Sequence, residues 1–438
     1  MKRNIYDKLL EWKSSKRRKP LLMRGARQTG KTYILKEFGS REYKNCIYCN
    51  FEDDSELDHF FQRNLDPERI VSELSVYLKQ DIKPHRDLIF FDEIQASDRA
   101  LTALKYFQEK KNSFHIVAAG SLLGVKLSSS GSFPVGKVNF LCLYPMTFME
   151  FLTAMNEDLY RRLLENIDSF TPIPEAFHND LIRLLCQYYA VGGMPEAVQC
   201  FSELKDAGKV RSIQLEIINS YILDFAKHAP VADIPKLSLI WESIPTHLAR
   251  ENKKFIFSAL KKSARAREYE NALKWLEDSD LSIKAVAAET GRYPLKHYAD
   301  KSCFKIYALD VGLLGAMAAS PIDLLVKGNR IFNEYEGAFV ENFVAQQMVS
   351  HFNQQLFYWR SKGGKAEVDF LCEFSGNVYP LEVKAGINPR SKSLKSYDMQ
   401  FSPVKLGRTN LLNFKKDGKL CNLPLYAISL LERFLSAK

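Results

Sequence analysis

A stretch near the N-terminus has residue types and a spacing suited to binding a chain of phosphates. It follows the pattern G-x-x-x-x-G-K-T and consists of Gly25, Ala26, Arg27, Gln28, Thr29, Gly30, Lys31 and Thr32. The glycines let the backbone curl so that its N–H groups point at the phosphates, and the first turn of a following helix adds unpaired N–H groups. In that geometry Lys31 reaches the β- and γ-phosphates, and the Thr32 hydroxyl binds Mg²⁺. The stretch therefore predicts a site for ATP and Mg²⁺, the alternative being a glycine-bearing turn that binds nothing.

A pair of acidic residues further along the chain completes the pattern. Asp92 and Glu93 directly follow the apolar run 88–91. Asp92 is predicted to hold Mg²⁺ through water, and Glu93 to orient and deprotonate the attacking water. The acidic pair and the phosphate loop together predict one ATP-hydrolysing site.

The elements that must position these residues are strands and helices that alternate up to about residue 150. Apolar runs at 21–23, 45–51, 88–91 and 115–119 predict strands, and helical stretches lie between them. Such alternation predicts a parallel sheet with right-handed crossovers, and ligands bind at the carboxyl ends of its strands. We therefore predict an α/β fold with the parallel sheet of a P-loop NTPase over residues 1–155.

Four segments together resemble one prokaryotic family, the AAA-like P-loop ATPases whose C-terminal domain of unknown function is related to PD-(D/E)XK nucleases. The segments are the phosphate loop, Asp-Glu-Ile-Gln at 92–95, Ala-Gly-Ser at 119–121 and Tyr-Pro-Met-Thr-Phe-Met-Glu-Phe at 144–151. The resemblance implies that Ser121 contacts the γ-phosphate or the attacking water, the alternative being a plain turn after a strand. Relatives usually carry Arg where this chain has Lys137, and Lys is a point charge whereas Arg grips a phosphoryl group with two hydrogen bonds. The presence of Lys137 therefore counts against a phosphate-stabilising role at this position, and it does not affect the prediction of nucleotide binding.

The middle of the chain is predicted to form a helical lid and then a winged-helix-like domain. The lid covers 156–232, where Gly192 and Gly193 supply unusual backbone angles. Residues 233–320 show three helices followed by a strand pair at 281–285 and 304–309. Lys and Arg residues without an acidic neighbour gather at 253–267. This basic cluster suits phosphate contacts on DNA, and a solvated face or a subunit contact is the alternative.

Residues 325–438 carry a second constellation that could do chemistry. Asp369 is followed about a dozen residues later by Glu382 and Lys384, and Glu341 lies in a helix predicted over 333–348. This order is the PD-(D/E)XK arrangement and predicts an α/β nuclease-like domain. Alternate side chains of a strand share a face, so Glu382 and Lys384 point together, and Asp369 joins them from the neighbouring strand. Glu341, Asp369 and Glu382 are predicted to bind Mg²⁺, which polarises a phosphodiester, while Lys384 positions or deprotonates water.

Two residues beside this constellation could contact nucleic acid. Trp359 and Arg360 are predicted to stack on or grip its backbone. The alternative for the whole domain is a degenerate nuclease-like fold that is kept for binding or assembly.

Composition bounds the remaining possibilities. The 438 residues are enough for roughly two to four domains, and the net charge of +10 suits nucleic acid only where the charge clusters. The eight scattered cysteines predict a reduced, cytoplasmic protein, and the C-x-x-C of Cys46 and Cys49 lacks the further ligands of a zinc site. No apolar run is long enough to span a bilayer, so no membrane partner is predicted.

These patterns together predict an ATP-binding, ATP-hydrolysing AAA-like ATPase coupled to a nuclease-like domain that acts on or near DNA. The alternative is a nucleotide-dependent switch that binds a protein partner and carries an inert tail. A homo-oligomer stays open, because relatives of the AAA type often work as rings.

Overall fold

The structure is a computed structural model that describes residues 1–129, 136–250, 253–322, 336–361, 363–364, 366–386 and 391–436. The chain divides into two compact units. The first unit comprises residues 1–144 together with the short segment 278–281, and the second comprises residues 145–277 and 282–438.

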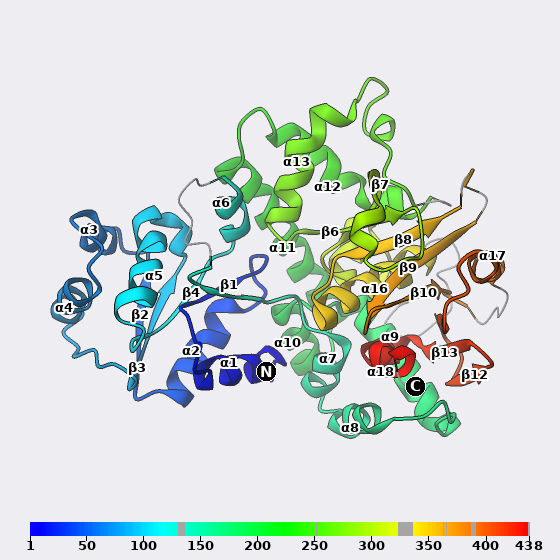
Figure 1. Ribbon diagram of the computed structural model, residues 1–438, viewed down its shortest axis with the longest axis horizontal. Coiled ribbons are helices and arrows are strands. Elements are labelled where there is room, and N and C mark those ends of the chain that lie inside the picture. Colours follow the sequence, from blue (N-terminus) through cyan, green and yellow to red (C-terminus); the bar gives the residue numbers. More distant parts are fainter. Residues whose placement is uncertain are drawn as a thin grey trace. The chain divides into compact units, whose positions relative to one another are not determined.

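The first unit is built on a five-stranded sheet in which every neighbouring pair is parallel (Figure 1). The strand order is β2-β3-β4-β1-β5, so that β1 lies between β4 and β5. The strands are β1 (Leu21–Arg24), β2 (Asn45–Asn50), β3 (Asp87–Asp92), β4 (His115–Ala119) and β5 (Asn139–Cys142). Ligands of such sheets bind at the carboxyl ends of the strands, and the phosphate loop follows β1 there.

Helices cover both faces of this sheet. They are α1 (Ile5–Ser14), α2 (Lys31–Glu42), α3 (Glu56–Gln62), α4 (Pro67–Tyr77), α5 (Asp98–Lys110) and α6 (Leu123–Ser129). Alternate residues of β3 point to opposite faces, so Leu88 and Phe90 join a core cluster with α1 and α2, whereas Ile89 and Phe91 join one with α3, α4 and α5. Burial on both faces is the reason why this strand reads as a continuous apolar run.

The predicted parallel α/β fold is confirmed in this unit. All four predicted strands form within about two residues of the expected bounds, and β5 is a fifth strand that the sequence analysis did not identify. Cys46 and Cys49 lie in β2 and contribute to the core clusters on opposite faces of the sheet, so they do not converge on one point. Each of the eight cysteines is a free thiol.

The second unit begins with helices, as predicted for residues 156–232. The helices of this unit are α7 (Phe148–Ala154), α8 (Asp158–Asn166), α9 (Glu175–Val191), α10 (Pro195–Leu204), α11 (Ala207–His228), α12 (Ile234–Leu248), α13 (Ala266–Asp278), α14 (Val311–Met317), α16 (Glu336–Phe352), α17 (Lys392–Phe401) and α18 (Leu431–Ser436). Gly192 adopts a φ of +75°, and its neighbour Gly193 donates its N–H to the buried carboxylate of Asp310. Gly192 therefore has the unusual backbone angle that the sequence predicted, whereas Gly193 has no positive φ and is instead required by a close approach, because a Cβ there would lie 2.1 Å from the carbonyl oxygen of Met146.

An eight-stranded mixed sheet runs through the second unit (Figure 1). Its order is β12-β13-β11-β10-β9-β8-β6-β7. The strands are β6 (Ser282–Ala288), β7 (Ala299–Ala308), β8 (Leu356–Arg360), β9 (Glu367–Phe374), β10 (Asn377–Val383), β11 (Leu406–Asn410), β12 (Lys415–Asp417) and β13 (Leu420–Pro424).

The strand pair predicted as a wing forms, but in a different setting. β6 pairs antiparallel with β7 and parallel with β8, so the pair is the edge of the same sheet that carries the nuclease-like motif. A separate winged-helix-like domain over 233–320 with a boundary near 320–325 therefore does not describe the structure. The parallel partner of β6 is β8, which lies about seventy residues further along the chain. A local sequence pattern cannot reveal so distant a pairing.

The two faces of this sheet carry different chemistry. Trp359 on β8 is buried and packs edge-on against Tyr397 of α17. The neighbouring Tyr358 points to the opposite face, where its hydroxyl lies 3.0 Å from Cys303 Sγ of β7. Trp359 is thus a core residue, and the prediction that it stacks on nucleic acid is wrong.

Candidate functional site

The phosphate loop has the backbone conformation that its glycines were expected to allow. The φ angles of Gly25, Gln28 and Gly30 are +144°, +66° and +92°. A Cβ on Gly25 would lie 2.2 Å from the carbonyl oxygen of Leu143, so no larger residue fits there. α2 begins at Lys31, directly after this turn, and leaves the first N–H groups of the helix at the loop.

Lys31 is buried, and its ammonium group lies over its own loop. Nζ donates hydrogen bonds of 2.8 Å and 2.9 Å to the carbonyl oxygens of Gly25 and Ala26. Burial lowers the pKa of Lys31, while the carboxylates of Glu93, Asp280 and Asp92 oppose that shift. The lysine therefore faces several acids but bonds to backbone oxygens that phosphate oxygens can replace.

The two predicted Mg²⁺ residues lie in contact. Thr32 Oγ1 donates a 2.8 Å hydrogen bond to Asp92 Oδ2, and the Tyr48 hydroxyl donates to the same oxygen at 3.0 Å. Burial raises the pKa of Asp92, and the charge of Glu93 adds to the shift. Tyr48 was missed from the sequence, although its alternation with Cys49 on β2 could have shown which face it shares.

Glu93 is held beside Asp92 by an unusual backbone conformation. Its φ of +48° is in the left-handed region, and Gln95 Nε2 donates a 2.6 Å hydrogen bond to its Oε2. The backbone N–H and hydroxyl of Ser121 both lie 3.4 Å from the same oxygen. The structure thus brings Glu93 and Ser121 together at the ends of neighbouring strands β3 and β4.

The other loop residues hold the turn in place. Thr29 donates its hydroxyl to the carbonyl oxygen of Ala26 at 2.9 Å, and Arg3 donates to the carbonyl oxygen of Thr29 at 2.9 Å. Arg27 lies 3.9 Å from Glu52. Lys137 forms an ion pair of 2.9 Å with Glu109.

One acid near the loop was not identified from the sequence. Asp280 belongs to the short segment 278–281 that packs within the first unit, and its Oδ1 lies 3.7 Å from Arg24 NH2. Burial raises the pKa of Asp280 against the opposing charges of Arg24 and Lys31. Its position far along the chain, without a motif around it, gave no signal.

The second constellation is a buried network of charges centred on Glu341 of α16. Lys305 and Tyr307 of β7 donate to Glu341 Oε1 at 3.0 Å and 2.5 Å, and Lys253 forms an ion pair with Oε2. Lys305 also forms an ion pair of 2.7 Å with Glu367. Burial pushes the pKa of Glu341 upward, but the two ammonium groups outweigh it and hold the pKa at about 2. Lys305 and Tyr307 were missed because they come from a strand assigned to another domain.

The other predicted residues lie on neighbouring strands. Asp369 Oδ2 accepts a 2.8 Å hydrogen bond from the N–H of Val383, and Glu382 Oε1 lies 2.6 Å from Lys384 Nζ. Glu382 Oε2 is buried and has no hydrogen-bond partner within the described part of the chain. Burial, together with the charge of Glu341, raises the pKa of Asp369 to about 7.

The metal site predicted from these carboxylates is not formed as a cluster. Among the residues that the structure describes, no group of three or more His, Cys, Asp or Glu side chains could hold a metal ion. Glu341 has both oxygens bonded to cationic or hydroxyl groups. Metal binding at Glu341, Asp369 and Glu382 stays a prediction.

Three family models match separate parts of the chain. Residues 17–152 match a model described as an AAA domain. Residues 182–323 and 336–425 match two models described as domains of unknown function, DUF8612 and DUF4143. The first unit therefore contains an AAA-like P-loop ATPase domain. No curated protein matches the chain.

Several solved structures are similar to the chain at low identity. The Walker-type ATPase of Pyrococcus abyssi is 14% identical over 72% of this chain and 95% of that chain, with a TM-score of 0.43. The ORC1 protein of Aeropyrum pernix, solved in complex with DNA, is 14% identical over 73% and 91%, with a TM-score of 0.29. Scores this low carry no argument about function.

Among the described residues, no helix has the length and apolar character needed to cross a membrane.

Proposed function

We propose that the first unit binds and hydrolyses ATP and that the second unit contains a nuclease-like domain acting on or near DNA. The observation that carries the first half is the 2.8 Å hydrogen bond between Thr32 Oγ1 and Asp92 Oδ2. It brings Thr32, the last residue of the phosphate-loop motif, to the acid that ends β3. The match of residues 17–152 to an AAA domain supports the same conclusion.

ATP and Mg²⁺ fit the groups that this site contains. The N–H groups of the loop and the ammonium of Lys31 would hold the β- and γ-phosphates, and Lys31 would exchange its two carbonyl contacts for phosphate oxygens. Thr32 and Asp92 would hold Mg²⁺, which neutralises phosphate charge when bound.

Glu93 is proposed as the base. It would accept a proton from the attacking water, a role that general-base catalysis gives a carboxylate within hydrogen-bond reach. Gln95 fixes one carboxylate oxygen of Glu93, and Ser121 lies beside the same oxygen, where it would contact the water or the γ-phosphate.

Phosphate release in the presence of Mg²⁺ tests this assignment. Lys31→Ala is expected to abolish ATP binding and turnover, and Glu93→Gln to keep binding while turnover falls at least about a hundredfold. Arg41→Ala, an exposed change on the same helix α2, is the control and should change neither. Unchanged turnover in Lys31→Ala rejects the site.

The second half of the proposal concerns Asp369, Glu382 and Lys384. Two of the three predicted ligands fit a divalent cation, because Glu382 has a buried oxygen without a partner in the described residues and Asp369 has a raised pKa. Asp369 and Glu382 would hold Mg²⁺, which polarises a phosphodiester when bound, and Lys384 would position water. Glu341 does not fit, because Lys253, Lys305 and Tyr307 already hold its oxygens.

A second candidate function is a nucleotide-dependent switch that binds a protein partner and carries an inert tail. The saturated Glu341 favours it. Incubating the full chain with plasmid and Mg²⁺ or Mn²⁺ separates the two. Metal-dependent nicking that Asp369→Ala abolishes supports the nuclease, whereas no nicking and no DNA retention at low salt support the switch.

A further inference from the structure

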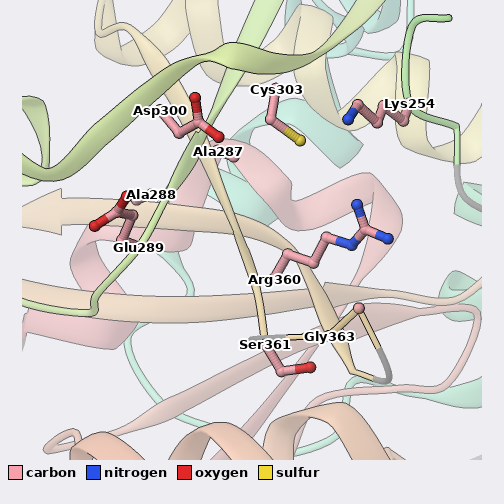
Figure 2. A pocket seen from close by; sticks show the side chains of 10 residues that line it. Lys254, Ala287, Ala288, Glu289, Asp300, Cys303, Arg360, Ser361 and Gly363 are labelled. Carbon is pink, nitrogen blue, oxygen red and sulfur yellow. The ribbon is translucent and has the colours of Figure 1, made fainter.

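A pocket of about 320 Å³ lies in the second unit at the edge of the eight-stranded sheet. Four charged side chains line it, together with Cys303 and the backbone after β8: Lys254, Glu289, Asp300 and Arg360. Figure 2 shows the two carboxylates on one side of the pocket and the ammonium and guanidinium groups on the other. The pocket therefore has one anionic wall and one cationic wall.

The pocket adjoins the charge network around Glu341. Arg360 is paired across β8 and β9 with Glu367, which forms the 2.7 Å ion pair with Lys305. Lys254 follows Lys253, the residue that bonds Glu341. Cys303 of the pocket and Lys305 of the network are two residues apart on β7 and share one face of the sheet.

The lining selects a ligand with two unlike ends. A guanidinium group with an ammonium beside it binds phosphate oxygens, whereas carboxylates accept hydrogen bonds from amino groups. The volume is at the lower end of the range for small-molecule sites, about 300–1,000 Å³, and one nucleotide is of matching size.

We propose that this pocket binds one nucleotide unit of a nucleic-acid strand. Its phosphate lies against Arg360 and Lys254, and an exocyclic amino group of its base lies against Asp300 and Glu289. The proposal rests on the proposed action of the second unit on nucleic acid, and it adds the element that holds the strand beside the carboxylates.

A glycine after β8 gives a precise way to disturb the cationic wall. A Cβ on Gly364 would lie 2.3 Å from a guanidinium nitrogen of Arg360, whereas a Cβ on Gly376, in the turn between β9 and β10, would meet nothing within 4 Å. Both residues have positive φ, +71° and +79°, so alanine strains the backbone at either position. Gly364→Ala therefore displaces the Arg360 side chain without removing its charge, and Gly376→Ala, which does not line the pocket, is its control.

Calorimetry on the full chain, with a non-hydrolysable ATP analogue saturating the phosphate loop, measures the pocket directly. The probes are deoxycytidine 5′-monophosphate, thymidine 5′-monophosphate, which lacks an exocyclic amino group, and deoxycytidine, which lacks the phosphate. We expect deoxycytidine 5′-monophosphate to bind most tightly. Each of the other two probes should bind more weakly by a factor of roughly ten or more, because each loses a hydrogen bond to a charged group. Arg360→Ala, Lys254→Ala and Gly364→Ala should each weaken the first probe by about tenfold.

Lys301→Ala and Gly376→Ala should leave the affinity unchanged, because neither residue lines the pocket. Equal affinity of the three probes, or no effect of Arg360→Ala, overturns the pocket. Single-stranded DNA retained equally by wild type and Arg360→Ala also overturns it, yet leaves the action on DNA standing. Binding of the mononucleotide with no retention of DNA leaves a mononucleotide site but rejects both the DNA strand as its ligand and the action on DNA.

Discussion

The buried ammonium of Lys305 offers the sharpest test of the charge network, through the substitution Lys305→Met. Lys305 is only 1% exposed and forms ion pairs of 3.0 Å with Glu341 and 2.7 Å with Glu367. Methionine fills the space but leaves both carboxylates without this partner. Breaking a buried pair by removing one member costs about 3–5 kcal/mol. Glu341 keeps Lys253 and Tyr307, and Glu367 reaches solvent, so we expect the lower end of that range.

A loss of about 3 kcal/mol lowers the Tm of a unit of a few hundred residues by roughly 6–12 °C. The assay is thermal unfolding followed by calorimetry, with Lys301→Met as the control, because Lys301 is exposed on the same strand β7. A Tm of Lys305→Met equal to that of Lys301→Met would refute the reasoning.

Three further predictions concern other parts of the chain. Burial lowers the pKa of His115 to about 4, so stability is full above pH 6.5 and is lost as the pH falls toward 4. His115→Gln should remove about 3 kcal/mol of this pH dependence, seen as a smaller fall in Tm between pH 6.5 and pH 4. Asp310→Ala leaves three buried N–H groups unbonded and should cost about 3 kcal/mol in urea unfolding, unlike the exposed Asp417→Ala. Gly25→Ala should abolish ATP binding in calorimetry, because its Cβ meets a backbone oxygen at 2.2 Å, whereas Gly386→Ala meets nothing and should not.

The conformation of the phosphate loop and the place of the two acids could be predicted from the sequence because these parts are local. A phosphate loop is set by the glycines of one short segment, and Asp92 ends its strand with Glu93 directly after it. Burial of the strand on both faces makes the apolar run visible as well. Tyr48 and Asp280 escaped detection, since each reaches the site only through the folding of distant segments.

The second unit was harder to predict because its sheet is assembled from distant segments. β6 and β7 precede β8 by a long stretch of chain, so their local pattern suited a wing as well as a sheet edge. The same pairing places Lys305 and Tyr307 beside Glu341. Trp359 points to the other face of the sheet, where it packs against Tyr397 in the core. The basic residues at 253–267 could not be told apart by sequence. In the structure Lys253 forms an ion pair with Glu341, whereas Lys254 lines the pocket.

The two charged sites differ in how their lysines are held, and this difference ranks the two proposed activities. Lys31 bonds to neutral carbonyl oxygens and has a lowered pKa, so a triphosphate offers it a stronger partner than the one it leaves. Lys305 bonds to two carboxylates, and these raise its pKa against the effect of burial. A divalent cation would have to compete with that ammonium for Glu341, whereas at Asp369 and Glu382 it would meet less competition. We therefore expect ligand exchange at Lys31 in the first site, and in the second site only at Asp369 and Glu382.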